Sequence, residues 1–287
     1  MNGIGRLSLV GIAMAILSAG RPAAGQGQQE SFDYLAQDLS VLGANAIVGG
    51  LTGAIRAVLE GRPVASAFAR GALGGSVVFA GKALASRDGS LAPPTGRILA
   101  GIGTSIVLNS HREALLDTLY FSLGPVQLRS GRGSRLRPQV SVAINDAVAL
   151  ARIVRESETE IDWGRSLSAL TPVFQTKRGA IRLDGGPVNG FTSAGTVVLD
   201  GTLTNGSDDT FRHEVVHVIQ HQFSASAWSL PVESWALSKA GVDRWIPSWL
   251  EFNMVFPSIV WAADELADGN GVYTRIVQAE AEWFERR

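Results

Sequence analysis

The feature that most constrains the fold of this chain is the stretch DDTFRHEVVHVIQHQF, residues 208–223, which has the periodicity of an amphipathic helix. One side of such a helix collects apolar residues, namely Phe211, Val215, Val216, Val218, Ile219 and Phe223. The opposite side collects polar residues, namely His213, Glu214, His217, Gln220, His221 and Ser224, and only Gln222 breaks the pattern. Solvent-facing helix surfaces usually carry lysines and glutamates rather than histidines. We therefore expect the apolar side to be buried and the polar side to serve a site.

Within this helix the segment His213-Glu214-Val215-Val216-His217 places two histidines four residues apart on one face. Both imidazoles can then reach one zinc ion at about 2.0–2.1 Å. Glu214 can take a proton from a metal-bound water and pass it to a leaving group. The pattern predicts a catalytic site with Zn2+ as cofactor. A non-catalytic metal site and an exposed helix face with hydrogen-bonded histidines are the alternatives.

His221 lies on the same face, but it is displaced from His213 by about 12 Å along the helix axis. One ion cannot easily bind His213, His217 and His221 together. We therefore expect His221 to support the ligands or to face the substrate as a further catalytic group.

A catalytic zinc needs a third protein ligand and an open position. The glycine and histidine that follow the motif in metzincins are absent after His217, so a glutamate from a later helix is the alternative. Glu280 is our first choice, because it lies in the middle of the apolar arc of the last predicted helix, where a carboxylate is costly unless it is paired. An ion pair with an arginine such as Arg244 or Arg275 would also satisfy it. The remaining candidates are Glu233, Glu251 and Glu265.

These segments resemble a known group of enzymes. HEVVHVIQ is similar to the active helix of zincin metallopeptidases, particularly short bacterial members that read His-Glu-x-x-His-x-x-Gln. QAEAEWF resembles the Glu-x-Glu-Ala-x-x-Phe stretch that supplies the glutamate ligand in gluzincin-type enzymes.

The resemblance implies a zinc peptidase with a set of roles for this chain. Glu280 takes the ligand role with His213 and His217, Glu214 is the general base, and Gln278 stands where the family often has another glutamate. The resemblance also implies that TVVLDGTL, residues 196–203, is an edge strand that pairs with an extended substrate.

The beginning of the chain predicts export. Arg6 precedes an apolar run over 7–17, and small residues follow at 23–25, as in a secretion signal spanning residues 1–25. We expect a periplasmic, cell-envelope-associated or secreted protein. The chain has no cysteine, so no disulfide framework is expected.

Residues 26–111 are predicted to form a helical region rich in glycine and alanine. Its apolar stretches, 39–55, 71–81 and 98–110, carry small residues that let helices approach closely, either in a membrane or in soluble hairpins. A membrane span normally needs about 20 residues, so only the first stretch comes near that length.

The rest of the chain, 112–287, is predicted to be a zincin-like metal-binding domain. Alternating segments with Gly-Pro and Asp-Gly breaks predict strands between 115 and 204, and helices follow the motif. The fold class is therefore α+β, with a small sheet upstream of the motif helix.

The preferred function is an exported zinc metallopeptidase that acts on a protein or peptide substrate. The alternative is a membrane-associated envelope protein with a structural metal site, because six of the seven tryptophans follow residue 225 and tryptophan favours membrane interfaces. Basic and acidic residues nearly cancel, 25 against 26, so no nucleic-acid partner is expected. Nothing in the sequence indicates an oligomeric state.

Overall fold

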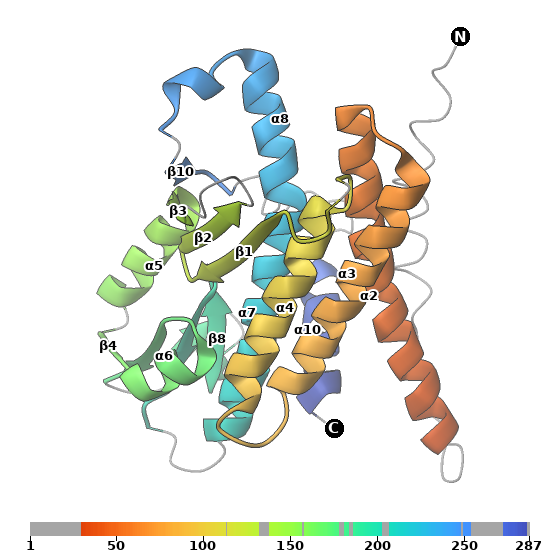
Figure 1. Ribbon diagram of the computed structural model, residues 1–287. Helices are drawn as coiled ribbons and strands as arrows, with labels where there is room; N and C mark the ends of the chain where they lie inside the picture. The colour runs from red at the N-terminus through yellow and green to blue at the C-terminus, as the bar shows by residue number, and fades with distance from the viewer. Residues whose placement is uncertain are drawn as a thin grey trace. The chain divides into compact units, whose positions relative to one another are not determined.

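The computed structural model describes residues 30–112, 114–131, 138–156, 158–177, 181–183, 186–202, 207–247, 249–253 and 272–285 (Figure 1). The predicted secretion signal lies outside these residues. The chain divides into a unit of residues 1–40 and a unit of residues 41–287. Helix α2 (Glu30–Glu60) begins in the first unit and continues into the second.

Helices α2, α3 (Val64–Ala85) and α4 (Ala92–Asn109) form a layer whose backbones touch through glycines. A Cβ atom on Gly49 would lie 2.3 Å from the carbonyl oxygen of Gly71. A Cβ atom on Gly74 would lie 2.7 Å from the carbonyl oxygen of Gly103. The small residues of this region thus allow a helix approach that a side chain would prevent.

Two segments of this layer, Leu39–Glu60 and Val64–Ala85, are long and apolar enough to cross a membrane by length and composition alone. Core helices of soluble proteins pass the same test. Both the soluble and the membrane-associated interpretation of this region therefore stay predictions.

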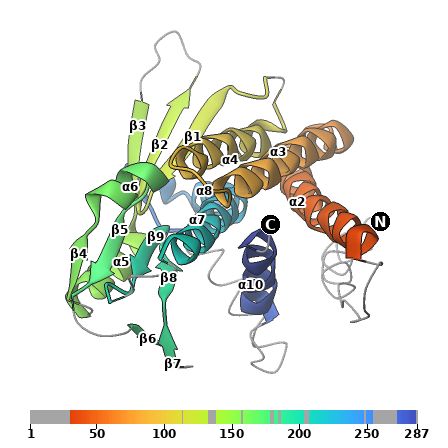
Figure 2. The same cartoon turned by 90° about the horizontal axis from the view of Figure 1, so that it is seen from below.

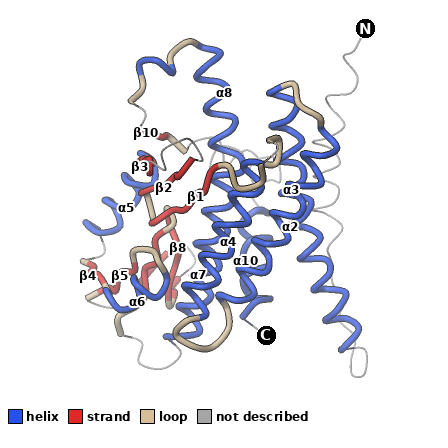
Figure 3. Tube along the Cα trace, viewed as in Figure 1, coloured by secondary structure: helices blue, strands red, loops and turns tan. Residues whose placement is uncertain are grey.

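The strands form the α+β arrangement expected after residue 115 (Figure 3). One sheet has the order β1-β2-β3-β10, with β1 (Thr118–Leu123), β2 (Val126–Gly131), β3 (Pro138–Ala143) and β10 (Leu250–Glu251). The second has the order β4-β5-β9-β8, with β4 (Thr159–Ile161), β5 (Val173–Thr176), β9 (Thr196–Leu199) and β8 (Gly190–Ser193). The short strands β6 (Ile181–Leu183) and β7 (Gly186–Val188) pair with each other. Helices α5 (Ile144–Glu156) and α6 (Trp163–Ala169) connect the strands.

The strand that was expected at the sheet edge lies inside the sheet. β9 pairs in parallel with β5 on one side and antiparallel with β8 on the other. All four residues of β9 are buried, and a continuously buried strand belongs between neighbours rather than at an edge. The edge next to the motif helix is therefore β8, whose residues are half-buried.

The motif helix α7 (Ser207–Ser224) lies between the helical layer and the second sheet (Figure 2). Its predicted apolar side is buried, as expected, against the core residues Val78, Ala100 and Val107 of the helical layer and Val173 and Val197 of the sheet. Gln222, the exception in the pattern, is also buried. The chain continues through a π-helical turn (Ala225–Ser229), α8 (Leu230–Ala240) and a 3-10 turn (Asp243–Trp245).

The last helix, α10 (Val272–Glu285), packs on α7. Ala281, Trp283 and Phe284 form a buried cluster with Val216 of α7, against which Phe79 of α3 packs. This packing brings the polar residues of α10 to the polar side of the motif helix.

The predicted boundary at residue 111 falls between α4 and β1, where helices give way to strands. Residues from both sides of it share one core and one compact unit.

Candidate metal centre

The two motif histidines converge. Their Nε2 atoms are 3.1 Å apart, and the rings meet edge to face with centroids 4.7 Å apart. Two nitrogens bound at tetrahedral angles to one zinc ion would be roughly 3.3 Å apart. The pair is therefore spaced as two ligands of a single cation would be.

The third group at this point is an amide. Gln278 of α10 has its Oε1 atom 3.1 Å from His217 Nε2 and its Nε2 atom 3.1 Å from His213 Nε2. As a metal ligand its oxygen would be uncharged, whereas zinc sites usually use cysteine, histidine or a carboxylate.

Glu280, the expected third ligand, is held elsewhere. Its Oε1 atom accepts hydrogen bonds from Lys82 Nζ at 2.8 Å and from Asn45 Nδ2 at 2.7 Å. Its Oε2 atom accepts from Lys82 Nζ at 2.9 Å and from Gln220 Nε2 at 2.7 Å. The carboxylate on the apolar arc is thus satisfied by a lysine from the helical layer and by the side-chain amides of Asn45 and Gln220.

Among the described residues no group of three or more histidine, cysteine, aspartate or glutamate side chains is arranged to hold a metal. The structure therefore does not bring Glu280 together with His213 and His217 as a ligand set. Gln278 occupies the place expected of Glu280.

The other glutamates considered as ligands also have different partners. Glu233 Oε2 accepts from the backbone N–H of Asn253 at 3.0 Å. Glu251 accepts from Ser141 Oγ at 2.6 Å and pairs with Arg129 at 2.5 Å. Glu265 lies outside the described residues.

Glu214, the predicted general base, is buried with 5% of its surface exposed. The hydroxyl of Thr192 lies 2.7 Å from Glu214 Oε2 and 3.0 Å from its backbone carbonyl oxygen. Because Thr192 belongs to β8, the carboxylate is held against the edge strand of the sheet.

His221 is held by α5. Its Nε2 atom is 3.3 Å from Asp146 Oδ2, which also accepts from Asn253 Nδ2 at 3.0 Å. A role for His221 in catalysis stays a prediction, and the structure shows a buried carboxylate as its partner.

Burial, together with the neighbouring His213, lowers the pKa of His217, although hydrogen bonds from its ring to the side-chain oxygens of Gln220 and Gln278 act the other way. A neutral imidazole keeps the lone pair that metal binding requires. Burial alone would raise the pKa of Glu280, but Lys82, Asn45 and Gln220 together bring it below its ordinary value of 4.5. The Lys82–Glu280 pair is therefore an ion pair at neutral pH.

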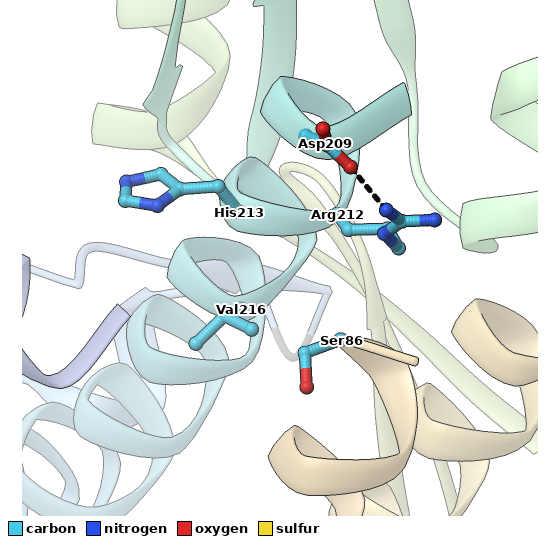
Figure 4. Close-up of a pocket in the computed structure, with 5 residues that line it drawn as sticks. All are labelled: Ser86, Asp209, Arg212, His213 and Val216. Atoms are coloured by element: carbon cyan, nitrogen blue, oxygen red, sulfur yellow. Dashed lines mark hydrogen bonds and ion pairs between the residues drawn. The ribbon is translucent and has the colours of Figure 1, made fainter. Parts of the chain in front are cut away.

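A small pocket opens beside His213 at the start of α7, lined also by Ser86, Asp209, Arg212 and Val216 (Figure 4). Arg212, which could have stabilised an oxyanion, forms ion pairs with Asp209 and, at 2.5 Å, with Asp88. Its positive charge is therefore already engaged with two carboxylates.

Sequence reasoning missed the contribution of the helical layer to this centre. Asn45 and Lys82 were not candidates, and Gln220 was placed on the polar arc without a role. A signal was present, because Lys82 stands alone in a stretch that is otherwise small and apolar. A lysine in such a setting needs a buried acidic partner if the helix is packed on both sides.

No protein-family model, no curated protein and no solved structure matches this chain. The resemblance to zincins accordingly stands on the motif residues themselves.

Proposed function

We propose that this chain is an exported zinc metallopeptidase whose metal is held by His213, His217 and the amide oxygen of Gln278. The observation that carries the proposal is the 3.1 Å approach of the Nε2 atoms of His213 and His217, with the side-chain amide of Gln278 3.1 Å from both. When bound, zinc would polarise a scissile carbonyl and lower the pKa of a coordinated water. Glu214 would accept the proton of the attacking water at its carboxylate and pass it to the leaving amine.

The ligand set proposed here is neutral, unlike a set of two histidines and a glutamate. A neutral set leaves more of the cation's charge to act on the substrate carbonyl, and it also binds the cation less tightly than a set with a carboxylate. We therefore expect reversible zinc binding that a strong chelator removes.

The position of β8 at the edge of the sheet favours a peptide as the substrate. An extended peptide can add to an exposed sheet edge through main-chain hydrogen bonds. Thr192 of β8 contacts Glu214, so a peptide on this edge would lie next to the proposed base.

The proposal is tested by metal analysis of the purified protein and by cleavage of an unfolded protein substrate. Glu214→Gln is expected to retain zinc and to lose cleavage by about 10²–10⁴-fold, and His213→Ala is expected to lose zinc. Glu160→Gln, which changes an exposed glutamate on β4, is the matched control and should behave as wild type. Full cleavage by Glu214→Gln would refute the general base, and absence of any divalent metal would refute the centre.

A membrane-associated envelope protein with a structural metal site is the second candidate. It is favoured by the two segments of membrane-spanning length and by Trp235, Trp245 and Trp249, which are 42%, 76% and 56% exposed. Fractionation of the cell separates the candidates. Recovery in the soluble periplasm without detergent would count against membrane association, and bound metal without any hydrolysis would favour the structural role.

A further inference from the structure

The second half of helix α8 and the segment that follows it are left uncovered by the rest of the chain. Helix α8 packs mainly against the two turns next to it in the sequence, and its end projects beyond the strands (Figure 1). Of the described residues in the range 234–249, all are exposed except Leu237 and Ile246, which are half-buried. We call residues 234–249 the α8 tip.

The exposed surface of the α8 tip is rich in large apolar side chains. Trp245 is 76% exposed, Trp249 is 56% exposed, and Trp235 and Val242 are 42% and 40% exposed. Trp163 on α6 is the one other exposed tryptophan among the residues that the structure describes. A single exposed apolar residue is ordinary, but several of them gathered in one projecting segment mark a surface that meets a partner or a membrane.

Two of these tryptophans have a cation beside them. The guanidinium of Arg244 lies over the ring of Trp245, 5.6 Å from the ring centroid. Lys239 follows Trp235 by one turn on the same face of α8. Asp243 is the one acidic residue of the α8 tip, so two cations stand against one anion. The tip therefore combines indole rings with a net positive charge.

This combination fits the surface of a bilayer better than the groove of a protein. At a membrane interface, indole rings lie at the level of the headgroups, and basic side chains meet anionic lipid phosphates. A helix that binds a protein groove presents apolar anchors at positions i, i+3 or i+4, and i+7. After Trp235 the positions i+3 and i+4 of α8 are Ser238 and Lys239, so polar residues interrupt such a stripe. The other two tryptophans lie beyond the end of the helix.

We propose that the α8 tip docks the protein on a bilayer that contains anionic lipid, with its exposed tryptophans in the headgroup region and Lys239 and Arg244 on lipid phosphates. The attachment is peripheral, so neither α2 nor α3 has to cross the membrane. It does not depend on zinc or on peptide cleavage, and it holds the protein at a membrane whether the metal centre is catalytic or structural.

The experiment is flotation of the purified protein, without detergent, with vesicles of phosphatidylcholine alone or mixed with phosphatidylglycerol. The wild type should bind the mixed vesicles more tightly. Trp245→Ser/Trp249→Ser should lower the affinity by more than about tenfold, because less apolar surface is buried in the interface. Trp163→Ser removes an exposed tryptophan from α6, and this matched control should bind as the wild type does. All three positions are exposed, so urea denaturation should show an unchanged fold.

A second pair of variants tests the cations. Each basic residue near an anionic surface should contribute about fivefold to the affinity, so Lys239→Gln/Arg244→Gln should bind the mixed vesicles about 20–30-fold less tightly. Its affinity for phosphatidylcholine alone should not change. Arg152→Gln/Arg155→Gln removes the same charge from exposed positions on α5 and should stay close to the wild type. An equal loss in both pairs would assign the effect to net charge and contradict the role of the two tip cations.

The remaining outcomes are equally decisive. A wild-type protein that binds neither kind of vesicle would overturn the proposal. Vesicle binding that Trp245→Ser/Trp249→Ser leaves intact would assign the attachment to another segment. Self-association that this variant abolishes, without any vesicle binding, would make the tip an interface between copies of the chain and would also overturn the proposal. Vesicle binding through the tip by a protein that takes up no metal would support this inference and refute the proposed function.

Discussion

Two cations are buried on neighbouring helices of the glycine-rich layer, and they are satisfied in different ways. Lys82 of α3 pairs with the carboxylate of Glu280. Arg97 of α4 is fully buried, and among the described residues it has no carboxylate partner. Its guanidinium donates to Gln222 Oε1 and to the backbone carbonyl oxygens of Ser122 at 2.7 Å, Ala169 at 3.2 Å and Leu170 at 3.3 Å.

The difference follows from the shapes of the two groups. A guanidinium has five N–H donors in a plane and is more weakly hydrated than an ammonium, so carbonyl oxygens from several elements can satisfy it. The ammonium of lysine is compact and strongly hydrated, and it is buried at lower cost with a carboxylate. Arg97 therefore holds α4, α6, β1 and α7 together through its hydrogen bonds. The Lys82–Glu280 pair instead links α3 to α10, and Glu280 accepts a hydrogen bond from Gln220 of α7.

The largest effect on stability is expected from Arg97→Met. The change leaves several buried acceptors without donors, so the free energy of unfolding should fall by about 3–5 kcal/mol. Arg87→Met, at an exposed position on the same layer, should stay within about 0.5 kcal/mol of wild type. Urea denaturation measures both.

The zinc affinity of Arg97→Met, measured at a temperature where this variant is folded, tests whether the two cations have separate tasks. We expect it to be unchanged, since Arg97 binds elements of the fold and not the histidines. If Arg97→Met lost as much zinc affinity as Lys82→Met/Glu280→Met, the two cations would not have separate tasks.

A smaller effect is expected from Gly75→Ala. Its Cβ atom would lie 2.0 Å from the carbonyl oxygen of Asn45, so α2 and α3 must separate at the residue that supports Lys82. Overpacking of this kind should cost about 2–3 kcal/mol and should also weaken zinc binding. Gly43→Ala in α2 is the control, because nothing lies within 4 Å of its Cβ position. That change should stabilise the helix by about 0.5–1 kcal/mol. Equal behaviour of the two variants in urea denaturation would contradict the close approach of α2 and α3.

The local parts of this site were predictable from the sequence. The spacing of His213 and His217, and the buried apolar side of the helix that carries them, follow from helix periodicity alone. The strands β1, β2, β3, β6 and β9 follow from alternation and turn residues. In each case the determining residues are close together in the chain.

The features that the sequence did not predict depend on contacts between segments that are far apart in the chain. The interpretation of Glu280 as needing a partner was sound, but Lys82 is 198 residues away in the sequence, and no local pattern relates the two. The choice between Gln278 and Glu280 depends on the rotation of α10 against α7. The placement of β9 inside the sheet depends on β8, a short half-buried strand that the sequence pattern did not reveal.

The smallest expected effect is a difference in pH dependence between the two cations. The pKa of Glu280 is below 4.5 in the folded protein and close to 4.5 when the chain is unfolded. As the pH falls, the unfolded state therefore binds this proton first. The stabilisation from the Lys82–Glu280 pair is fully present above pH 4.5 and is lost as the pH falls through the lowered pKa.

Urea denaturation at pH 7, 5, 4 and 3.5 should accordingly show a stability difference between wild type and Lys82→Met/Glu280→Met that shrinks in acid. Arg97→Met should show a constant difference over the same range, because burial lowers the pKa of Arg97 only to about 9 and the group stays charged throughout. A constant difference for the Lys82 pair would mean that Glu280 is not held as a carboxylate.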